Sequence, residues 1–139
     1  MRTMIFMERS GPRILVADDD PDVLHDVAEA LESMGARITR AASGAELMAH
    51  LGDDDPYDLI VTDVAMPWMT GLQAMHSTRY AGLATPVIVM TALRDESLPA
   101  KVQTLGENAV LLRKPFGMSE LASAVARLIP QAVDSGENA

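Results

Sequence analysis

The sequence contains no cysteine, which excludes disulfide bonds, thiolate metal ligands and thiol nucleophiles. Aromatic residues are scarce as well, because one Trp, two Tyr and two Phe leave the core to aliphatic side chains and to methionine. No apolar run approaches the roughly 18 residues that a membrane span needs, and the apolar patch after Arg2 is too short for a signal peptide. We therefore expect a cytoplasmic protein without membrane insertion.

Basic residues are also few: 11 Lys and Arg stand against 20 Asp and Glu, for a net charge of −9. This balance argues against direct contact with nucleic acid, which needs clustered Lys and Arg, and is compatible with a Mg²⁺ site. The 139 residues are enough for one domain. We expect a flexible leader over 1–11, the domain over 12–130 and a disordered polar tail over 131–139.

Between these ends, short apolar segments typical of buried strands alternate with segments of helical spacing. Strands are predicted over 13–17, 36–41, 59–61, 87–90 and 109–112, and helices over about 21–34, 44–51, 72–81, 98–105 and 121–129. Such alternation indicates an α/β fold, a doubly wound parallel sheet of five strands with helices on both faces and right-handed crossovers.

The segment 57–71 is central to the functional prediction. Its apolar run ends at Thr62-Asp63, and the segment from Pro67 to Gly71 is typical of a loop. Asp63 is therefore predicted where a buried strand meets solvent, which is the edge at which open α/β sheets bind ligands.

Other strands also end in polar residues, namely Asp18 and Asp19, Thr91, and Lys114. Parallel strands point the same way, so these side chains should gather with Asp63 at one edge. Carboxylates ~5 Å apart repel by ~3 kcal/mol at an effective dielectric near 20, so the cluster needs a divalent cation, the lysine or proton uptake. A carboxylate beside Mg²⁺ and an ammonium group is a possible nucleophile toward phosphorus.

These motifs, in their order and spacing, resemble the response-regulator receiver domain of bacterial two-component signalling. The resemblance covers about 13–129 and rests on Asp18-Asp19, on Asp63 with Met66-Pro67 and Gly71, on Thr91-Ala92 and on Lys114-Pro115-Phe116. It implies a flavodoxin-like sheet with strand order 2-1-3-4-5.

The resemblance also implies the roles of the acidic residues. Asp63 would accept a phosphoryl group from a histidine kinase or a histidine phosphotransfer protein, in two-component or phosphorelay signalling. Asp19, Asp63 and the backbone carbonyl of Ala65 would bind Mg²⁺ directly, and Asp18 would support the metal through water.

Thr91 and Lys114 would contact the phosphoryl oxygens, and the Lys114–Pro115 peptide would be cis. No turnover of an external substrate is implied, only self-phosphorylation and slow self-dephosphorylation. Ala65 and Leu93, two residues after Asp63 and Thr91, cannot orient an attacking water, which predicts the slow dephosphorylation.

The sequence departs from the family pattern at several positions. The fifth strand lacks the usual aromatic residue, for which Val110 and Leu111 are the candidates, and the segment from Gly106 to Lys114 is one residue longer than usual. Thr70 stands where the family usually has Asp.

The leading hypothesis is a stand-alone receiver that signals by docking, since no output domain follows Ile129. The expected docking surface is formed by the fourth helix, fifth strand and fifth helix, and includes Lys101, Gln103, Arg113 and Arg127. Phosphoryl oxygens would draw Thr91 inward and bias that surface.

Two alternatives are also compatible with the sequence. An aspartyl phosphatase of the haloacid-dehalogenase type also uses a strand-end Asp, but it would need a second acid where this chain has Ala65. The chain could instead be a binding module whose phosphorylation is vestigial.

Other polar and aromatic residues are given structural interpretations. Asp20 is interpreted as a helix cap, Asp53 to Asp55 as a solvated loop, the three histidines as bystanders, and Trp68 as an exposed neighbour of Asp63.

Overall fold

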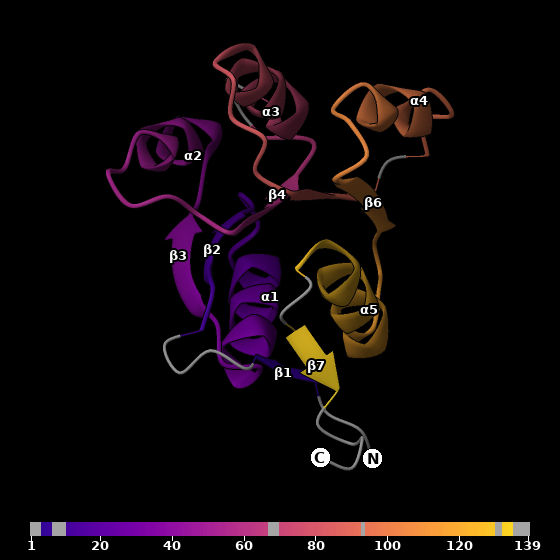
Figure 1. The fold of residues 1–139 in the computed structure, drawn as a ribbon. Helices are drawn as coiled ribbons and strands as arrows, with labels where there is room; N and C mark the ends of the chain where they lie inside the picture. The colour runs from indigo at the N-terminus through magenta and orange to yellow at the C-terminus, as the bar shows by residue number, and fades with distance from the viewer. Residues whose placement is uncertain (1–3, 7–10, 67–69, 93, 130–131, 135–139) are drawn as a thin grey trace.

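The computed structural model describes residues 4–6, 11–66, 70–92, 94–129 and 132–134. Their centre is a parallel sheet of five strands, in the order β3-β2-β4-β5-β6 (Figure 1). Counted along the sheet's own strands this is the predicted order 2-1-3-4-5, so the prediction of the fold is confirmed. The strands are β2 (Arg13–Ala17), β3 (Arg37–Ala41), β4 (Leu59–Asp63), β5 (Val87–Thr91) and β6 (Ala109–Arg113).

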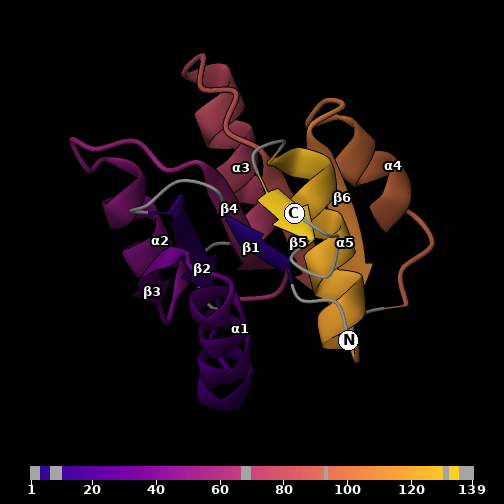
Figure 2. The same ribbon diagram turned by 60° about the horizontal axis from the view of Figure 1, so that its bottom comes forward.

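Helices cover both faces of this sheet, as Figures 1 and 2 show. Helices α1 and α5 pack on one face, and α2, α3 and α4 pack on the other. Their bounds are Pro21–Ser33 for α1, Gly44–Leu51 for α2, Gly71–Tyr80 for α3, Leu98–Gln103 for α4 and Met118–Leu128 for α5. Among the described residues, no helix is long and apolar enough to cross a bilayer.

The strands divide the interior into two apolar clusters, one on each face of the sheet. Ile14 and Val16 belong to the cluster under α1 and α5, whereas Leu15 and Ala17 belong to the cluster under α2, α3 and α4. Alternate side chains of a strand point to opposite faces, so a strand buried on both faces has a continuous apolar sequence. All residues of β4 and β5 are buried, which fixes where their polar ends lie.

Helix α1 begins immediately after the acidic residues that follow β2. The Oδ1 atom of Asp20 accepts hydrogen bonds from the backbone N–H groups of Asp22 (2.9 Å) and Val23 (3.4 Å), and Pro21 is the first helical residue. This is the predicted cap, and it leaves Asp18 and Asp19 at the end of the strand.

Side chains also cap the next two helices. At the start of α2, Ser43 Oγ accepts a hydrogen bond from Glu46 N (3.1 Å), and the Glu46 carboxylate accepts one from Ala42 N rather than from the cap residue. Helix α3 has a full capping box between Thr70 and Gln73. Thr70, which departs from the family pattern, thus has a structural function.

The two ends of the described chain pair with each other. Strands β1 (Met4–Phe6) and β7 (Ala132–Asp134) form a small antiparallel sheet, in which Met4 lies opposite Asp134. The expected flexible leader and disordered tail are wrong for these six residues. Each strand is too short to be recognised in the sequence, and the pairing satisfies backbone groups that the main sheet cannot reach.

Arg79, near the end of α3, joins several backbone segments at the edge of the molecule where β5 begins. Its guanidinium group donates to the carbonyl oxygens of Leu105 (2.9 Å), Leu83 (3.2 Å) and Thr85 (2.8 Å) and to Asn108 Oδ1 (3.1 Å). Burial lowers the pKa of this guanidinium from its ordinary value. One side chain therefore fixes the α3–β5 and α4–β6 connections together.

We expect Arg79→Ala to lower the free energy of unfolding by about 2 kcal/mol, because it removes charge-assisted hydrogen bonds from partly buried carbonyl groups. Arg40→Ala is the matched control, since the exposed Arg40 guanidinium has an ion pair with Glu32 and should contribute less than ~1 kcal/mol. Urea denaturation measures both variants. Equal effects of the two substitutions would contradict the proposed function of Arg79.

Candidate functional site

Three aspartates meet at the carboxyl ends of β2 and β4. Each of Asp18, Asp19 and Asp63 offers a carboxylate oxygen, and these oxygens lie within 4.8 Å of one another. Asp18 and Asp63 are buried, with 1% and 7% of their surface exposed, whereas Asp19 is exposed. The predicted convergence of acids from separate strands is therefore present in the structure.

Lys114 reaches these acids from the end of β6. Its Nζ atom lies 2.8 Å from Asp18 Oδ2 and 3.1 Å from Asp63 Oδ1. Its backbone N–H donates to the carbonyl oxygen of Thr91 (2.7 Å), which continues the β5–β6 pairing beyond the last residue of β6. The peptide between Lys114 and Pro115 is cis, as the resemblance implied.

Backbone hydrogen bonds fix the positions of the acids. Asp18 N donates to Ala41 O (3.1 Å), and Asp18 Oδ1 accepts from Asp20 N (2.9 Å). Just beyond Asp63, Val64 N donates to Met90 O (2.9 Å). Hydrogen bonds to β3 and β5 thus hold the backbone at Asp18 and next to Asp63, so the two carboxylates meet in a defined arrangement.

The environment of Asp63 disfavours its charged form. Burial raises the pKa of the Asp63 carboxyl, and the nearby charge of Asp18 raises it further, while the hydrogen bond and charge of Lys114 act in the opposite direction. For Lys114, burial lowers the pKa, but its pairing with Asp18 and Asp63 outweighs burial and raises it overall. The lysine stays charged and compensates only part of the negative charge of the three acids.

Thr91 ends β5 beside this cluster and is buried, with 1% of its surface exposed. In the β4–β5 register Asp63 lies opposite Met90, so Thr91 is one residue further along the neighbouring strand. Thr91 and Lys114 both line a cavity of about 420 Å³. The hydroxyl therefore lies at the same edge of the sheet as the acids.

Successive side chains along β6 point to opposite faces of the sheet, and this separates Val110 from Leu111, the two candidates for the position of the family's aromatic residue. Val110 packs against the cluster under α1 and α5, and Leu111 packs against the cluster under α2, α3 and α4. Val89 belongs to this second cluster, and Thr91, two residues later, projects to the same face. Leu111, not Val110, thus shares the face of Thr91.

Some predicted neighbours of the site lie outside the described residues, namely Trp68 and Leu93. Ala65 is described and exposed, two residues after Asp63.

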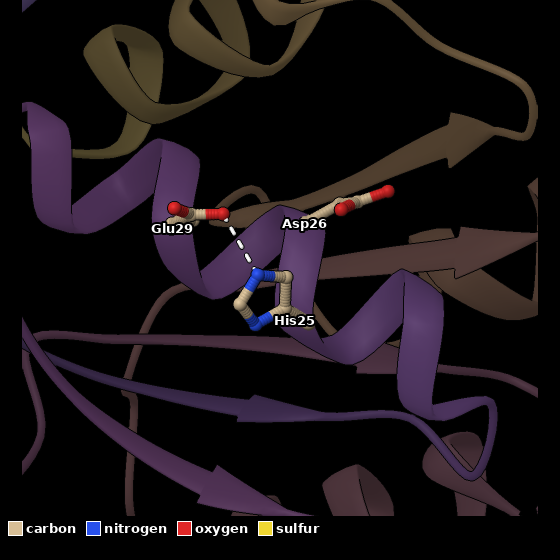
Figure 3. A group of neighbouring side chains, drawn as sticks. All are labelled: His25, Asp26 and Glu29. Carbon is tan, nitrogen blue, oxygen red and sulfur yellow. Dashed lines mark ion pairs between the residues drawn. The ribbon is translucent and has the colours of Figure 1, made fainter.

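A second acidic group lies on the surface of α1 and takes no part in this site. His25 and Glu29 point toward each other, with Nε2 and Oε2 2.9 Å apart, and Asp26 lies beside them (Figure 3). All three residues are exposed. The two residues are four positions apart, so the contact joins successive turns of the same helix.

We expect Asp63→Asn to stabilise the metal-free protein at neutral pH, with a Tm higher by a few degrees, because ionised Asp63 is buried beside Asp18. The pKa of Asp63 is higher in the folded protein than in the unfolded chain. The wild type is therefore most stable below the ordinary carboxyl pKa, where Asp63 is protonated in both states, and this stability is lost as the pH rises through the folded-state pKa. Thermal denaturation in a chelator, from acidic to neutral pH, should show the two proteins converging at low pH.

Asp54→Asn, which removes the same charge from an exposed loop, should leave the Tm nearly unchanged. A lower Tm for Asp63→Asn than for the wild type at neutral pH would contradict this account of the site.

Comparison with known proteins agrees with this geometry. Residues 14–126 match the model of the response regulator receiver domain. The chain is 35% identical over 121 residues to the transcriptional regulatory protein PrrA of Mycobacterium leprae, covering 86% of this chain and 51% of that protein. It is 33% identical over 115 residues to the regulator of RpoS of Escherichia coli, covering 83% of this chain and 34% of that protein. The chain spans about half the length, or less, of these curated relatives.

Solved structures of similar fold include the receiver domain of Francisella response regulator 1452, with a TM-score of 0.76 and 30% identity over 85% of this chain and 96% of that one. The chemotaxis response regulator CheY4 of Vibrio cholerae has a TM-score of 0.76 and 26% identity, over 86% of this chain and 99% of that one. The match of the family model to most of the chain, together with the shared fold, shows that the chain belongs to the response-regulator receiver domains of two-component signalling.

Proposed function

We propose that Asp63 is the phosphoacceptor of this receiver domain, and that its phosphorylation changes a protein-binding surface. The observation that carries the proposal is the position of the Lys114 ammonium group, 2.8 Å from Asp18 and 3.1 Å from Asp63 at the end of the sheet. This arrangement leaves a carboxylate with an adjacent fixed positive charge at the edge where α/β proteins bind ligands.

In the proposed reaction an Asp63 carboxylate oxygen attacks the phosphorus of a phosphohistidine on a histidine kinase or phosphotransfer protein. The new O–P bond forms as the N–P bond breaks, and the imidazole nitrogen leaves with the electron pair and takes up a proton from solvent. Lys114 Nζ stabilises one oxygen of the phosphoryl group in transit, and the Thr91 hydroxyl donates a hydrogen bond to another. Positioning and charge, rather than acid–base chemistry, account for the rate.

The three carboxylates fit a hard divalent cation such as Mg²⁺, because their oxygens converge and Lys114 compensates only part of their charge. Asp18, Asp19, Asp63 and the Ala65 carbonyl are the residues proposed to hold it. When bound, such an ion neutralises charge on the phosphoryl oxygens. Asp18 also holds Lys114 through its Oδ2 atom, so its substitution should disturb both the metal and the lysine.

An aspartyl phosphatase is the less favoured alternative. Receiver domains are signalling modules rather than enzymes that turn over an external substrate, and this chain belongs to that family. The position that would carry the phosphatase's second acid is Ala65, which is exposed and has only a methyl group.

The other alternative is a binding module whose phosphorylation is vestigial. Such a module would bind its partner with equal affinity with and without beryllofluoride, which imitates the phosphoryl group.

The signal is proposed to leave through the surface of α4, β6 and α5. Thr91 shares its face of the sheet with Leu111, beside α4, so a shift of Thr91 toward a phosphoryl group would open space on that side. Lys101, Gln103, Arg113 and Arg127 belong to this proposed surface. Leu111 takes the place of the family's aromatic residue, and its smaller side chain would report the shift by repacking.

Direct contact with nucleic acid is not part of the proposal, because the net charge is −9. PrrA is a transcriptional regulatory protein, but this chain spans only 51% of it. A cytoplasmic location likewise stays a prediction.

We expect a small phosphodonor with Mg²⁺ to add one phosphoryl group to the wild type and none to Asp63→Asn, as intact mass spectrometry can measure. Lys114→Ala should be labelled at least tenfold more slowly, because it removes about 1.4 kcal/mol or more of transition-state stabilisation. Asp54→Asn should be labelled like the wild type. Labelling of Asp63→Asn at the wild-type rate would contradict the assignment of Asp63 as the phosphoacceptor.

We expect the phosphorylated protein to lose its phosphoryl group slowly, because the Ala65 methyl group cannot orient water. Ala65→Asn should accelerate the loss several-fold by supplying an amide that can hold the attacking water. A time course of phosphate release after removal of the donor tests this. A variant rate equal to or below that of the wild type would count against the role assigned to this position.

A further inference from the structure

The residue that precedes Asp63 in β4 is a threonine whose side chain lies inside the protein. None of the surface of Thr62 is exposed (0%). Ile60, two residues earlier, belongs to the apolar cluster under α2, α3 and α4, so Thr62 projects into that same cluster. Its partners across the sheet, Ala17 and Val89, belong to this cluster as well. The hydroxyl is therefore a polar group in aliphatic surroundings, where the lack of a hydrogen bond would be costly.

The Thr62 hydroxyl donates a hydrogen bond to the backbone carbonyl oxygen of Asp63 (3.1 Å). The register of the sheet shows what this bond supplies. The pairing of β2 with β4 ends at Ala17 and Thr62, because β2 itself ends at Ala17. Asp63 thus extends one residue beyond β2, and its carbonyl oxygen lies past the last pair of that ladder. The hydroxyl is a donor at the point where the regular pairing of these two strands stops.

The other end of the same peptide group is fixed as well. Its N–H belongs to Val64 and donates to Met90 O on β5 (2.9 Å). A peptide unit is planar, and its C=O and N–H groups point in opposite directions, so hydrogen bonds at both ends set the rotation of its plane. This rotation determines the direction in which the chain leaves Asp63. The backbone that carries the reactive carboxylate is therefore held from β5 and from within β4.

The contacts of the Asp63 carboxylate depend on this backbone. Its Oδ1 atom lies 3.1 Å from Lys114 Nζ, which also lies 2.8 Å from Asp18 Oδ2. A rotation of the backbone at Asp63 would displace the carboxylate relative to this ammonium group. Displacement of a reacting group by about 1 Å can lower a rate by about 100-fold, so the hold on the peptide matters for the reaction.

We propose that Thr62 is a positioning residue for phosphoryl transfer to Asp63. Its hydroxyl fixes the peptide between Asp63 and Val64, and through that peptide the carboxylate that attacks phosphorus. This inference rests on the proposed function of Asp63. Thr62 acts through the backbone and exchanges no proton with the donor. Valine has nearly the shape of threonine without the hydroxyl, so Thr62→Val removes the donor from a buried carbonyl and keeps most of the packing.

The chain offers a matched control in α3. Thr78 is also buried (5% exposed), and its hydroxyl donates to a backbone carbonyl oxygen, that of Met75 (2.7 Å). Thr78→Val therefore removes the same kind of buried hydrogen bond, but from the second half of α3 rather than from the strand that carries Asp63. Thr62→Ser keeps the hydroxyl and loses a methyl group, so it separates loss of the donor from a change in packing.

The first measurement is the rate at which a saturating concentration of acetyl phosphate with Mg²⁺ labels the full chain, followed by intact mass spectrometry. In this reaction an Asp63 oxygen bonds to phosphorus as the bond from phosphorus to the acetyl oxygen breaks, and acetate leaves with the electron pair. We expect Thr62→Val to be labelled about three- to tenfold more slowly than the wild type. Thr62→Ser and Thr78→Val should be labelled at close to the wild-type rate. Circular dichroism at the assay temperature establishes that each protein is folded.

The second measurement follows the peptide itself, without donor or metal. Exchange of the Val64 amide hydrogen, observed by NMR spectroscopy, should be faster in Thr62→Val than in the wild type, because the peptide has lost its hydrogen bond at the carbonyl end. The Ile60 amide, which donates to Pro86 O (2.9 Å) at the start of β4, is the internal reference for a general loss of stability. Its exchange should change less than that of Val64.

The outcomes separate this proposal from the assignment of Asp63. Slower labelling of Thr62→Val, recovered in Thr62→Ser and accompanied by faster exchange at Val64 than at Ile60, supports the positioning role. Labelling of Thr62→Val at the wild-type rate, equal slowing by Thr78→Val, no recovery with serine, or unchanged exchange at Val64 overturns it while Asp63 remains the phosphoacceptor. If Thr62→Val does not fold, Thr62→Ala takes its place in the same comparisons. A wild-type chain that acetyl phosphate does not label overturns both proposals.

Discussion

The ion pairs of Lys114 with Asp18 and Asp63 are the interactions on which the site depends. They join the ends of β2, β4 and β6, which are far apart in the sequence, through one ammonium group. Taking such charges out of water is costly, and here it is offset only in part, as the raised pKa of Asp63 indicates. The site is therefore held in a state of unbalanced charge by the buried strands around it, and a cation or a phosphoryl group can change that balance.

The sequence was sufficient to predict this convergence because a parallel sheet simplifies the geometry. Apolar runs located the strands, and a polar residue at the end of each run could lie only at one edge. Asp20 as the cap of α1 and Asp18 and Asp19 as site residues followed from the same pattern, since Pro21 marks the first residue of the helix. These are local signals, which a single sequence carries well.

Other features depend on contacts between distant segments and could not be predicted. Nothing in the sequence around Arg79 indicates that its guanidinium group binds the carbonyls of two separate connections. The acidic loop was expected to be only solvated, yet Asp53 accepts a hydrogen bond from the hydroxyl of Tyr57 and contacts the imidazole of His50. The choice between Val110 and Leu111 required the register of β6, because adjacent residues of a strand face opposite clusters.

The pairing of β1 with β7 has a practical consequence for engineering the molecule. Strand β1 precedes the start of β2, and β7 follows the end of α5, so their small sheet lies at the pole remote from Asp63. Met4 and Asp134 are neighbours across it. A short linker could thus close the backbone into a ring, and the ring could be reopened in an exposed connection to give a circular permutant with the acidic cluster intact.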